Sequence, residues 1–319
     1  MDIIKPKALK KGEMVAIVAP SEPIKEIDLI RITKFFERMG YKVKHGENVL
    51  KKIGDYAAGS AADRAADLNW AFGDEEIRAV FAAIGGFVAS DTLEQLDFDL
   101  IKKNPKIFIG YSDATTLQLP ILAKTGLVTY HGPNAWNLPN LRSTGYTISN
   151  LWKVLTTPTP SGVVEPQSVW HEVREGKAEG ILFGGNLSCV CHLLGTKWDP
   201  IVALPKIFGE EAKFLFFWEE SYEQFSDIMR KLWHVRNTGF FERVSGMMVG
   251  KLTDVKEREY EGFPHKKDLL REVTEKFGFP VLYGVDFGHE VPKATIPIGI
   301  KAMMDTKNKK IEILEEEVV

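Results

Sequence analysis

The sequence predicts an α/β protein in which a mostly parallel sheet in the N-terminal half is followed by a second, mixed α/β domain. Between residues 14 and 131, short apolar runs alternate with amphipathic helical patterns, which is typical of a doubly wound parallel sheet. Residues 156–168 are rich in proline, threonine and serine, as linkers are. We therefore expect an N-terminal domain over residues 1–155, a linker over 156–175 and a C-terminal domain over 176–319.

The N-terminal half alternates regularly between the two kinds of element. Compact apolar runs predict strands, and apolar residues on one face predict helices. In chain order these are the strand MVAIVAPS, the helix IDLIRITKFFERMG closed by Gly40, the strand YKVKHGENV, the helix ADRAADLNWAFGD, the strands IRAVFAAIGG and KIFIGYSD, a helix from Asp113, and the strand LVTYHGP. Functional loops of such sheets lie beyond the carboxyl ends of the strands, so residues 19–21, 85–86 and 111–112 are expected at one edge.

The C-terminal half has shorter strands and fewer helices. Four β-like runs, GILFGG, AKFLFFWEE, VSGMMVGKL and PVLYGVDFG, accompany two helical segments, SYEQFSDIMRKLWHV and KKDLLREVTEKFG. This pattern predicts the second, mixed domain.

The composition places the chain among ordinary soluble globular proteins. Of its 319 residues, 44% are hydrophobic and 27% are charged, and the net charge is −3, so no strong field attracts nucleic acid or an anionic membrane. The residues at the start of the sequence lack the pattern of a signal peptide and the rest lacks an apolar run of membrane-spanning length, so we expect a cytoplasmic protein without a signal peptide. Cys189 and Cys191 lack the Cys-x-x-Cys spacing of redox or zinc sites and are expected to be free thiols.

Ser112 stands where the buried run 107–109 turns into a helix after Gly110. Two interpretations are open. Ser112 and Asp113 can cap the helix, or Ser112 can be a nucleophile held on a tight turn beside amides that bind an oxyanion.

Two features of the C-terminal half could complete a catalytic triad. Glu219 and Glu220 end an apolar strand, where a carboxylate can orient a histidine. His289 follows a glycine in a proline-containing loop. The order serine, acid, histidine is also that of α/β hydrolases, but composition alone does not select one of the seven histidines.

Six blocks in order resemble the LD-carboxypeptidase and microcin C immunity family of serine peptidases. They are AAGSAADRAADLNWAF, IGGFVASDTLEQLDFDLIKKNPKIFIGYSDATTL, TGLVTYHGP, AEGILFGGNLSCVCHLLGT, FLFFWEE and DFGHEVPKATIPIGIKA. The resemblance implies a flavodoxin-like N-terminal domain, a smaller β-rich C-terminal domain, catalysis at their interface, and a homodimer. It also implies a Ser112–Glu219–His289 triad, oxyanion donors at the amides of Gly86 and Asp113, and a substrate-side or loop-positioning role for Asn186.

The chain departs from the family pattern at residues 84–88, Ile-Gly-Gly-Phe-Val, where the family often has Arg-Gly-Gly-Tyr-Gly, and between Asn186 and Glu219, where it is longer. Aromatic and asparagine residues between positions 134 and 152 could reshape the pocket. Two substrates follow from the resemblance: a cytoplasmic muropeptide losing a terminal D-amino acid, or a peptidyl- or aminoacyl-nucleotide of the microcin C type. A binding module without activity is the third possibility. No metal or cofactor is expected.

Overall fold

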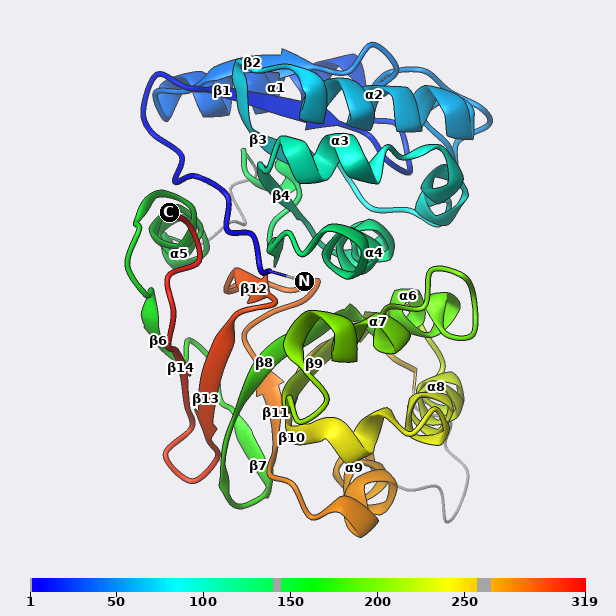
Figure 1. The fold of residues 1–319 in the computed structure, drawn as a ribbon, viewed down its shortest axis with the longest axis vertical. Coiled ribbons are helices and arrows are strands. Elements are labelled where there is room, and N and C mark those ends of the chain that lie inside the picture. Colours follow the sequence, from blue (N-terminus) through cyan, green and yellow to red (C-terminus); the bar gives the residue numbers. More distant parts are fainter. Residues whose placement is uncertain (1, 140–144, 257–264) are drawn as a thin grey trace.

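The computed structural model describes residues 2–139, 145–256 and 265–319 and shows an α/β protein with two sheets (Figure 1). The elements of the N-terminal half lie at the top of Figure 1, and most elements of the C-terminal half lie below them. The predicted fold class is confirmed.

The first sheet is mostly parallel, as predicted. Within the described residues its strands run in the order β2 (Lys42–His45), β1 (Met14–Val18), β3 (Ile77–Ala82), β4 (Ile107–Gly110), β5 (Thr129–His131) and β12 (Ile296–Ile298). The first five are parallel and β12 is antiparallel. The accompanying helices are α1 (Glu26–Arg38), α2 (Ala61–Gly73), α3 (Phe98–Lys103), α4 (Thr115–Thr125) and α5 (Gly145–Thr156), with the short 3₁₀ turns η1 (Ala89–Gln95), η2 (Ser112–Ala114) and η3 (Ala135–Asn137). Every residue of β4 is buried, which explains its unbroken apolar run.

The second sheet is mixed. Its strands, again among the described residues, run in the order β6 (Gly162–Val164), β14 (Lys310–Ile313), β13 (Lys301–Asp305), β8 (Lys177–Asn186), β9 (Phe214–Ser221), β10 (Val244–Thr253), β11 (Val281–Val285) and β7 (His171–Arg174). The helices here are α6 (Leu187–Leu193), α7 (Pro200–Phe208), α8 (Phe225–Asn237) and α9 (Lys266–Thr274), with the 3₁₀ turns η4 (Phe240–Arg243) and η5 (Glu275–Phe277). Strands β8 to β11 are parallel neighbours.

The structure adds three features to the predicted arrangement. Strand β12 comes from the C-terminal half but pairs with β5 in the first sheet. The segment 156–175, predicted to be a linker, contributes β6 and β7 to the second sheet. Helices α6 and α7 occupy sequence that was not predicted to be helical. The division into two domains at this segment stays a prediction.

The helix that follows Ser112 lies against the C-terminal half of the chain. Helix α4 contacts both α6 and α7, and the buried apolar side chains of the two sheets form one continuous core. The carboxyl end of β4 therefore faces elements of the second half. In the parts of the chain that the structure describes, every helix is too short or too polar to span a bilayer.

Candidate active site

Ser112 lies on a sharp turn between β4 and α4. Its backbone has φ of 61°, in the left-handed region that L-residues with a side chain rarely adopt. The side chain is partly exposed, whereas its neighbours Asp113 and Ala114 are buried. A strained strand-to-helix turn that leaves a serine accessible is the arrangement found at the nucleophile of many serine hydrolases.

Glu219 and His289 form a short hydrogen-bonded pair. Nδ1 of His289 lies 2.6 Å from Oε2 of Glu219, and the glutamate is fully buried while the histidine side chain is 15% exposed. His289 also lies beside the serine turn, because its ring packs edge-on against Tyr111, with 4.8 Å between the ring centroids. The structure therefore brings His289, Glu219 and the residue preceding Ser112 together.

The surroundings of Glu219 favour its ionised form. Burial raises the pKa of this carboxyl group, but His289, His131 and the Asn186 amide together lower it below the ordinary value of 4.5. An ionised carboxylate only accepts hydrogen bonds, so Nδ1 of His289 donates to it. In this tautomer, Nε2 of a neutral imidazole carries the lone pair with which a base accepts a proton.

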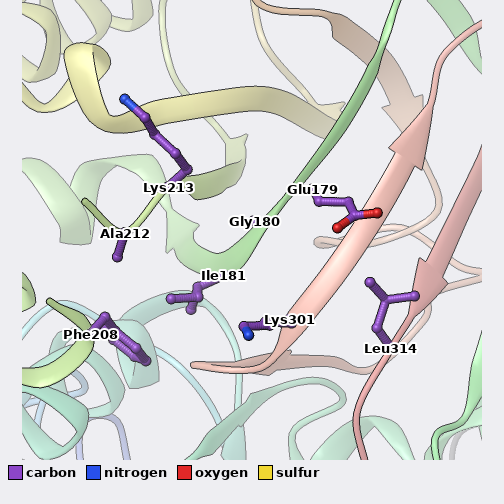
Figure 2. Close-up of a pocket in the computed structure, with 8 residues that line it drawn as sticks. All are labelled: Glu179, Gly180, Ile181, Phe208, Ala212, Lys213, Lys301 and Leu314. Atoms are coloured by element: carbon purple, nitrogen blue, oxygen red, sulfur yellow. The ribbon is translucent and has the colours of Figure 1, made fainter.

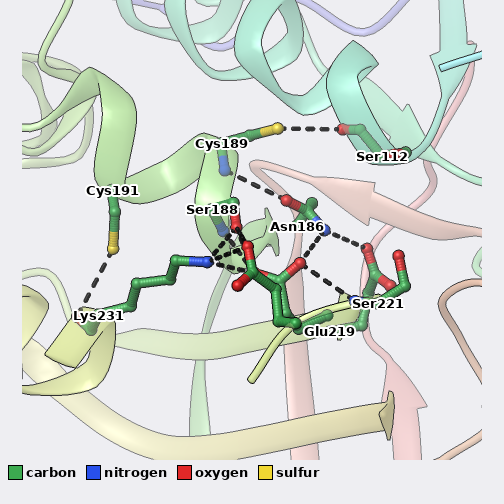
Figure 3. Close-up of polar contacts among 10 residues, drawn as sticks. Ser112, Asn186, Ser188, Cys189, Cys191, Glu219, Ser221 and Lys231 are labelled. Carbon is green, nitrogen blue, oxygen red and sulfur yellow. Dashed lines mark hydrogen bonds and ion pairs between the residues drawn. The ribbon is translucent and has the colours of Figure 1, made fainter. Parts of the chain in front are cut away.

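Glu220 lies in a neighbouring polar cluster around Ser188 and Lys231. Its carboxylate accepts hydrogen bonds from the amide and hydroxyl of Ser188, at 2.9 and 2.6 Å, and lies 3.5 Å from Nζ of Lys231. Figure 3 shows Lys231, Ser188 and Asn186 meeting at the end of β9. Successive side chains of a strand face opposite sides, so of the two glutamates only Glu219 contacts the histidine.

Asn186 links the acid to the serine turn. Its side-chain amide donates to Glu219 at 3.3 Å and to Glu220 at 3.0 Å, and its main-chain amide donates to the hydroxyl of Thr115 at 3.1 Å. Its side-chain oxygen caps α6 by accepting from the amide of Cys189. The thiol of Cys189 in turn contacts the carbonyl oxygen of Ser112 at 3.6 Å (Figure 3). These contacts fit a positioning role for Asn186.

The loop after β3 is held against the serine turn by the side chain of Asp113. Its carboxylate accepts from Ser21 Oγ at 2.6 Å and from the amide of Ala89 at 2.9 Å, and Ser21 Oγ accepts from the amide of Val88. The loop runs alongside the serine, since a Cβ atom built on Gly85 would lie 3.0 Å from Ser112 Oγ. The Asp113 carboxylate therefore holds together the two segments that carry the predicted oxyanion donors, the amides of Gly86 and Asp113.

Gly86→Ala is expected to disturb this loop and to lower kcat by about 100- to 1000-fold, the usual loss of an oxyanion donor. At Gly86, φ is +143° and an added Cβ would lie 2.3 Å from Ser21 Oγ and 3.0 Å from the amide nitrogen of Glu22. Steady-state kinetics and thermal unfolding measure the effect. Gly145→Ala is the matched control, because no atom of the described residues lies within 4 Å of its Cβ position. Unchanged kcat in Gly86→Ala, despite the clash with Ser21, would contradict the assignment of the Gly86 amide as an oxyanion donor.

Sequence reasoning placed Tyr111 at the functional edge of the sheet without giving it a role, and it missed the buried His131 that packs against Tyr111. His131 ends β5, and its ring packs edge-on against Tyr111 and Phe217. Burial lowers the pKa of His131 to about 4, so its ring is neutral at pH 7. His131 ends a strand that neighbours β4, the strand before Ser112. Because functional residues gather at the carboxyl ends of parallel strands, this position was the signal in the sequence that could have identified His131.

A separate pocket of about 360 Å³ lies elsewhere on the second half, between α7 and the beginnings of β8 and β13 (Figure 2). Its walls include Ile181, Phe208, Lys213 and Lys301 and none of the predicted site residues. As for metals, within residues 2–139, 145–256 and 265–319 no group of three or more His, Cys, Asp or Glu side chains is arranged to hold an ion.

Comparison with known proteins identifies the family. The model of the LD-carboxypeptidase N-terminal domain matches residues 15–132, and that of the LD-carboxypeptidase C-terminal domain matches residues 179–304. A probable murein peptide carboxypeptidase of Bacillus subtilis is 36% identical over 305 residues, covering 96% of this chain and 92% of that protein. The microcin C7 self-immunity protein MccF of Escherichia coli is 30% identical over 332 residues, covering 93% of this chain and 91% of that protein.

A solved structure agrees with these sequence matches. MccF in complex with aspartyl sulfamoyl adenosine superposes with a TM-score of 0.85 at 28% identity, and the match covers 99% of this chain and all of that one. Both family domains thus occur in order, and relatives at 30% identity or more extend over nearly the whole length. This protein is a member of the LD-carboxypeptidase family and a peptidase.

Proposed function

We propose that the protein is a serine carboxypeptidase that removes a terminal D-amino acid from muropeptides, with Ser112, Glu219 and His289 as its triad. The observation that carries the proposal is the 2.6 Å hydrogen bond between Glu219 and His289 next to the strained turn of Ser112. The proposal includes the two-domain division, in which residues 1–155 supply the nucleophile and residues 176–319 supply the acid and the base.

The proposed mechanism is acyl transfer in two steps. His289 Nε2 takes the proton of the Ser112 hydroxyl while Oγ attacks the carbonyl carbon of the scissile amide. The imidazolium then gives this proton to the leaving amine, which departs with the terminal residue. Water, deprotonated by the same histidine, hydrolyses the acyl-enzyme. Glu219 keeps the imidazole in the required tautomer and stabilises its charged form.

The tetrahedral intermediates carry a negative oxygen that needs preorganised donors. In the proposal these are the main-chain amides of Gly86 and Asp113, on the two segments that the Asp113 carboxylate holds together. Such donors lower the barrier because they already point at the site where charge develops.

A second candidate substrate is an aminoacyl- or peptidyl-nucleotide. It is favoured by the 30% identity to the self-immunity protein MccF and by the similarity to the structure of MccF with aspartyl sulfamoyl adenosine. The muropeptide proposal stands first because the murein peptide carboxypeptidase relative is more similar, at 36% identity. Both substrates contain an amide bond that the same triad can cleave.

Mass spectrometry of two incubations separates the candidates. We expect the protein to remove the terminal D-residue from a muropeptide tetrapeptide and to leave an aminoacyl-sulfamoyl adenosine intact. Cleavage of the nucleotide alone would replace the first candidate by the second, and cleavage of neither would contradict both. Ser112→Ala serves as the control for contaminating peptidases.

The proposal also places the enzyme in the cytoplasm, where it acts as a homodimer on a small peptide, without nucleic acid, membrane or cofactor as a partner. These features follow from the family resemblance and the composition, and they stay predictions.

A further inference from the structure

Lys293 is a buried lysine whose ammonium group contacts both the main chain of His289 and the ring of Tyr111. Its exposed fraction is 2%. Nζ donates a hydrogen bond to the main-chain oxygen of His289 at 3.2 Å and lies 4.1 Å from the centroid of the Tyr111 ring. The Tyr111 ring in turn packs edge-on against the His289 imidazole. One charged group thus contacts the residue preceding the serine and the backbone of the histidine.

The main chain around Lys293 is tied to other elements on both sides. Its amide donates to the hydroxyl of Thr147 on α5 at 3.0 Å, and the amide of Thr295 donates to Asn150 at 2.7 Å. On the other side, Nζ of Lys251 donates to the carbonyl oxygen of Pro292 at 3.3 Å. The lysine therefore projects from a held segment that runs between the two sheets.

Several titratable groups surround this ammonium. They are Glu219 on β9, Lys251 on β10, His131 on β5, Tyr111 after β4, and Glu290 and His289 on its own loop. Burial lowers the pKa of Lys293 to about 8; Glu219 and Glu290 oppose this effect and Lys251 adds to it. The close contacts are a carbonyl oxygen and an aromatic face, which hold the cation more weakly than a paired carboxylate does.

A buried charge of this kind does not stabilise the fold. The ordinary pKa of a lysine is 10.5, so between about pH 8 and 10.5 the unfolded chain binds a proton that the folded chain does not. Stability from this group consequently increases with pH across that window and is reduced below it. At neutral pH the buried ammonium group therefore lowers the stability of the fold.

We propose that Lys293 is a positioning residue, whose ammonium group joins the His289 backbone to the Tyr111 ring and so sets the imidazole against the Ser112 turn. It does not touch substrate. This inference rests on the proposed triad, because only a histidine that acts as the base needs such alignment with Ser112.

The test measures the rate at which a fluorophosphonate labels Ser112 from pH 6 to 10, which requires no knowledge of the natural substrate. The variants are Lys293→Met and Lys293→Arg, and thermal unfolding is recorded for each. Lys106→Met is the matched control: Lys106 is also buried, at 5% exposure, its pKa is also lowered to about 8 by burial, and its Nζ donates to the main-chain oxygen of Ala71. It precedes β4, at the strand end opposite Ser112.

We expect Lys293→Met to slow labelling at pH 7 by about 10- to 100-fold, as small misplacements of catalytic groups do, with a melting temperature equal to or above that of the wild type. The wild-type rate should decline above about pH 8 as the ammonium loses its proton. Lys293→Met should lack this decline, and Lys293→Arg should move it to higher pH because a guanidinium stays charged. Lys106→Met should label like the wild type.

The outcomes separate this inference from the proposed function. If the wild type is not labelled at Ser112, the serine mechanism fails. If the wild type is labelled and folded Lys293→Met labels equally fast, or slows without a change in pH profile, the positioning role of Lys293 is wrong while the triad stands. An equal loss in Lys106→Met would also overturn it, because the effect would then belong to any buried lysine.

Discussion

Replacing Ser112 by alanine is expected to lower kcat by on the order of 10⁶-fold. The loss is this large because the nucleophile and its base act as one unit, so that removing the nucleophile leaves the other triad residues without a function. Without Oγ there is no acyl-enzyme, and His289 has no hydroxyl proton to accept. The fold should remain, since alanine accepts the same turn at φ of 61° as well as serine does. Turnover of the cleaved substrate and covalent labelling by a fluorophosphonate measure the two losses.

Ser149→Ala is a suitable control for Ser112→Ala. The hydroxyl of Ser149 is exposed on α5 and donates to the main-chain oxygen of Tyr146, so labelling and turnover should match the wild type. Normal turnover in Ser112→Ala would rule out the serine mechanism, whatever the labelling result.

Glu219→Gln is expected to lower kcat by about 10³- to 10⁴-fold, the scale of removing the acid from such a triad. A glutamine amide presents a donor as well as an acceptor to Nδ1 of His289, so the imidazole loses its preference for the useful tautomer and its charged form loses a counter-ion. Stability should change with pH as well: the lowered pKa of Glu219 contributes stability above about pH 4.5, which is lost as the pH falls through the folded value. The variant should lack this dependence.

Glu220→Gln is the matched comparison, one residue further along β9. It should change kcat far less and cost about 1–3 kcal/mol of unfolding free energy, since it weakens the buried hydrogen bond from the Ser188 hydroxyl and removes the ion pair with Lys231. Parallel kinetics and denaturant unfolding of the two variants separate the roles. A larger kcat loss in Glu220→Gln would show that the acid is the second glutamate.

Local patterns predicted most elements because each depends on its own residues. The all-buried β4 appears as an unbroken apolar run, and α2 begins at a capping box in which Ser60 and Asp63 satisfy each other's amides. Helix α7 was missed because Pro200 and Pro205 give its sequence the composition of a loop, although Pro200 stands in the first turn, where proline is tolerated.

Long-range pairing was beyond local patterns. The three residues of β12 predict a strand but not a partner, and they pair with β5, far earlier in the chain. The same holds for the site. Ser112, Glu219 and His289 could be named from motif blocks, whereas the surroundings of His131 and Lys293 depend on which elements pack against them, and no local pattern encodes that.

The place of β12 has a consequence for the order in which the protein is made. A ribosome releases β5 long before residues 296–298 exist, so during synthesis the edge of the first sheet has no antiparallel neighbour. Unpaired edges attract other strands, and the histidine loop just before β12 stays unanchored for the same period. Until residues 296–298 are synthesised, the nascent chain therefore has both an unpaired strand edge at β5 and a proposed catalytic site without its histidine.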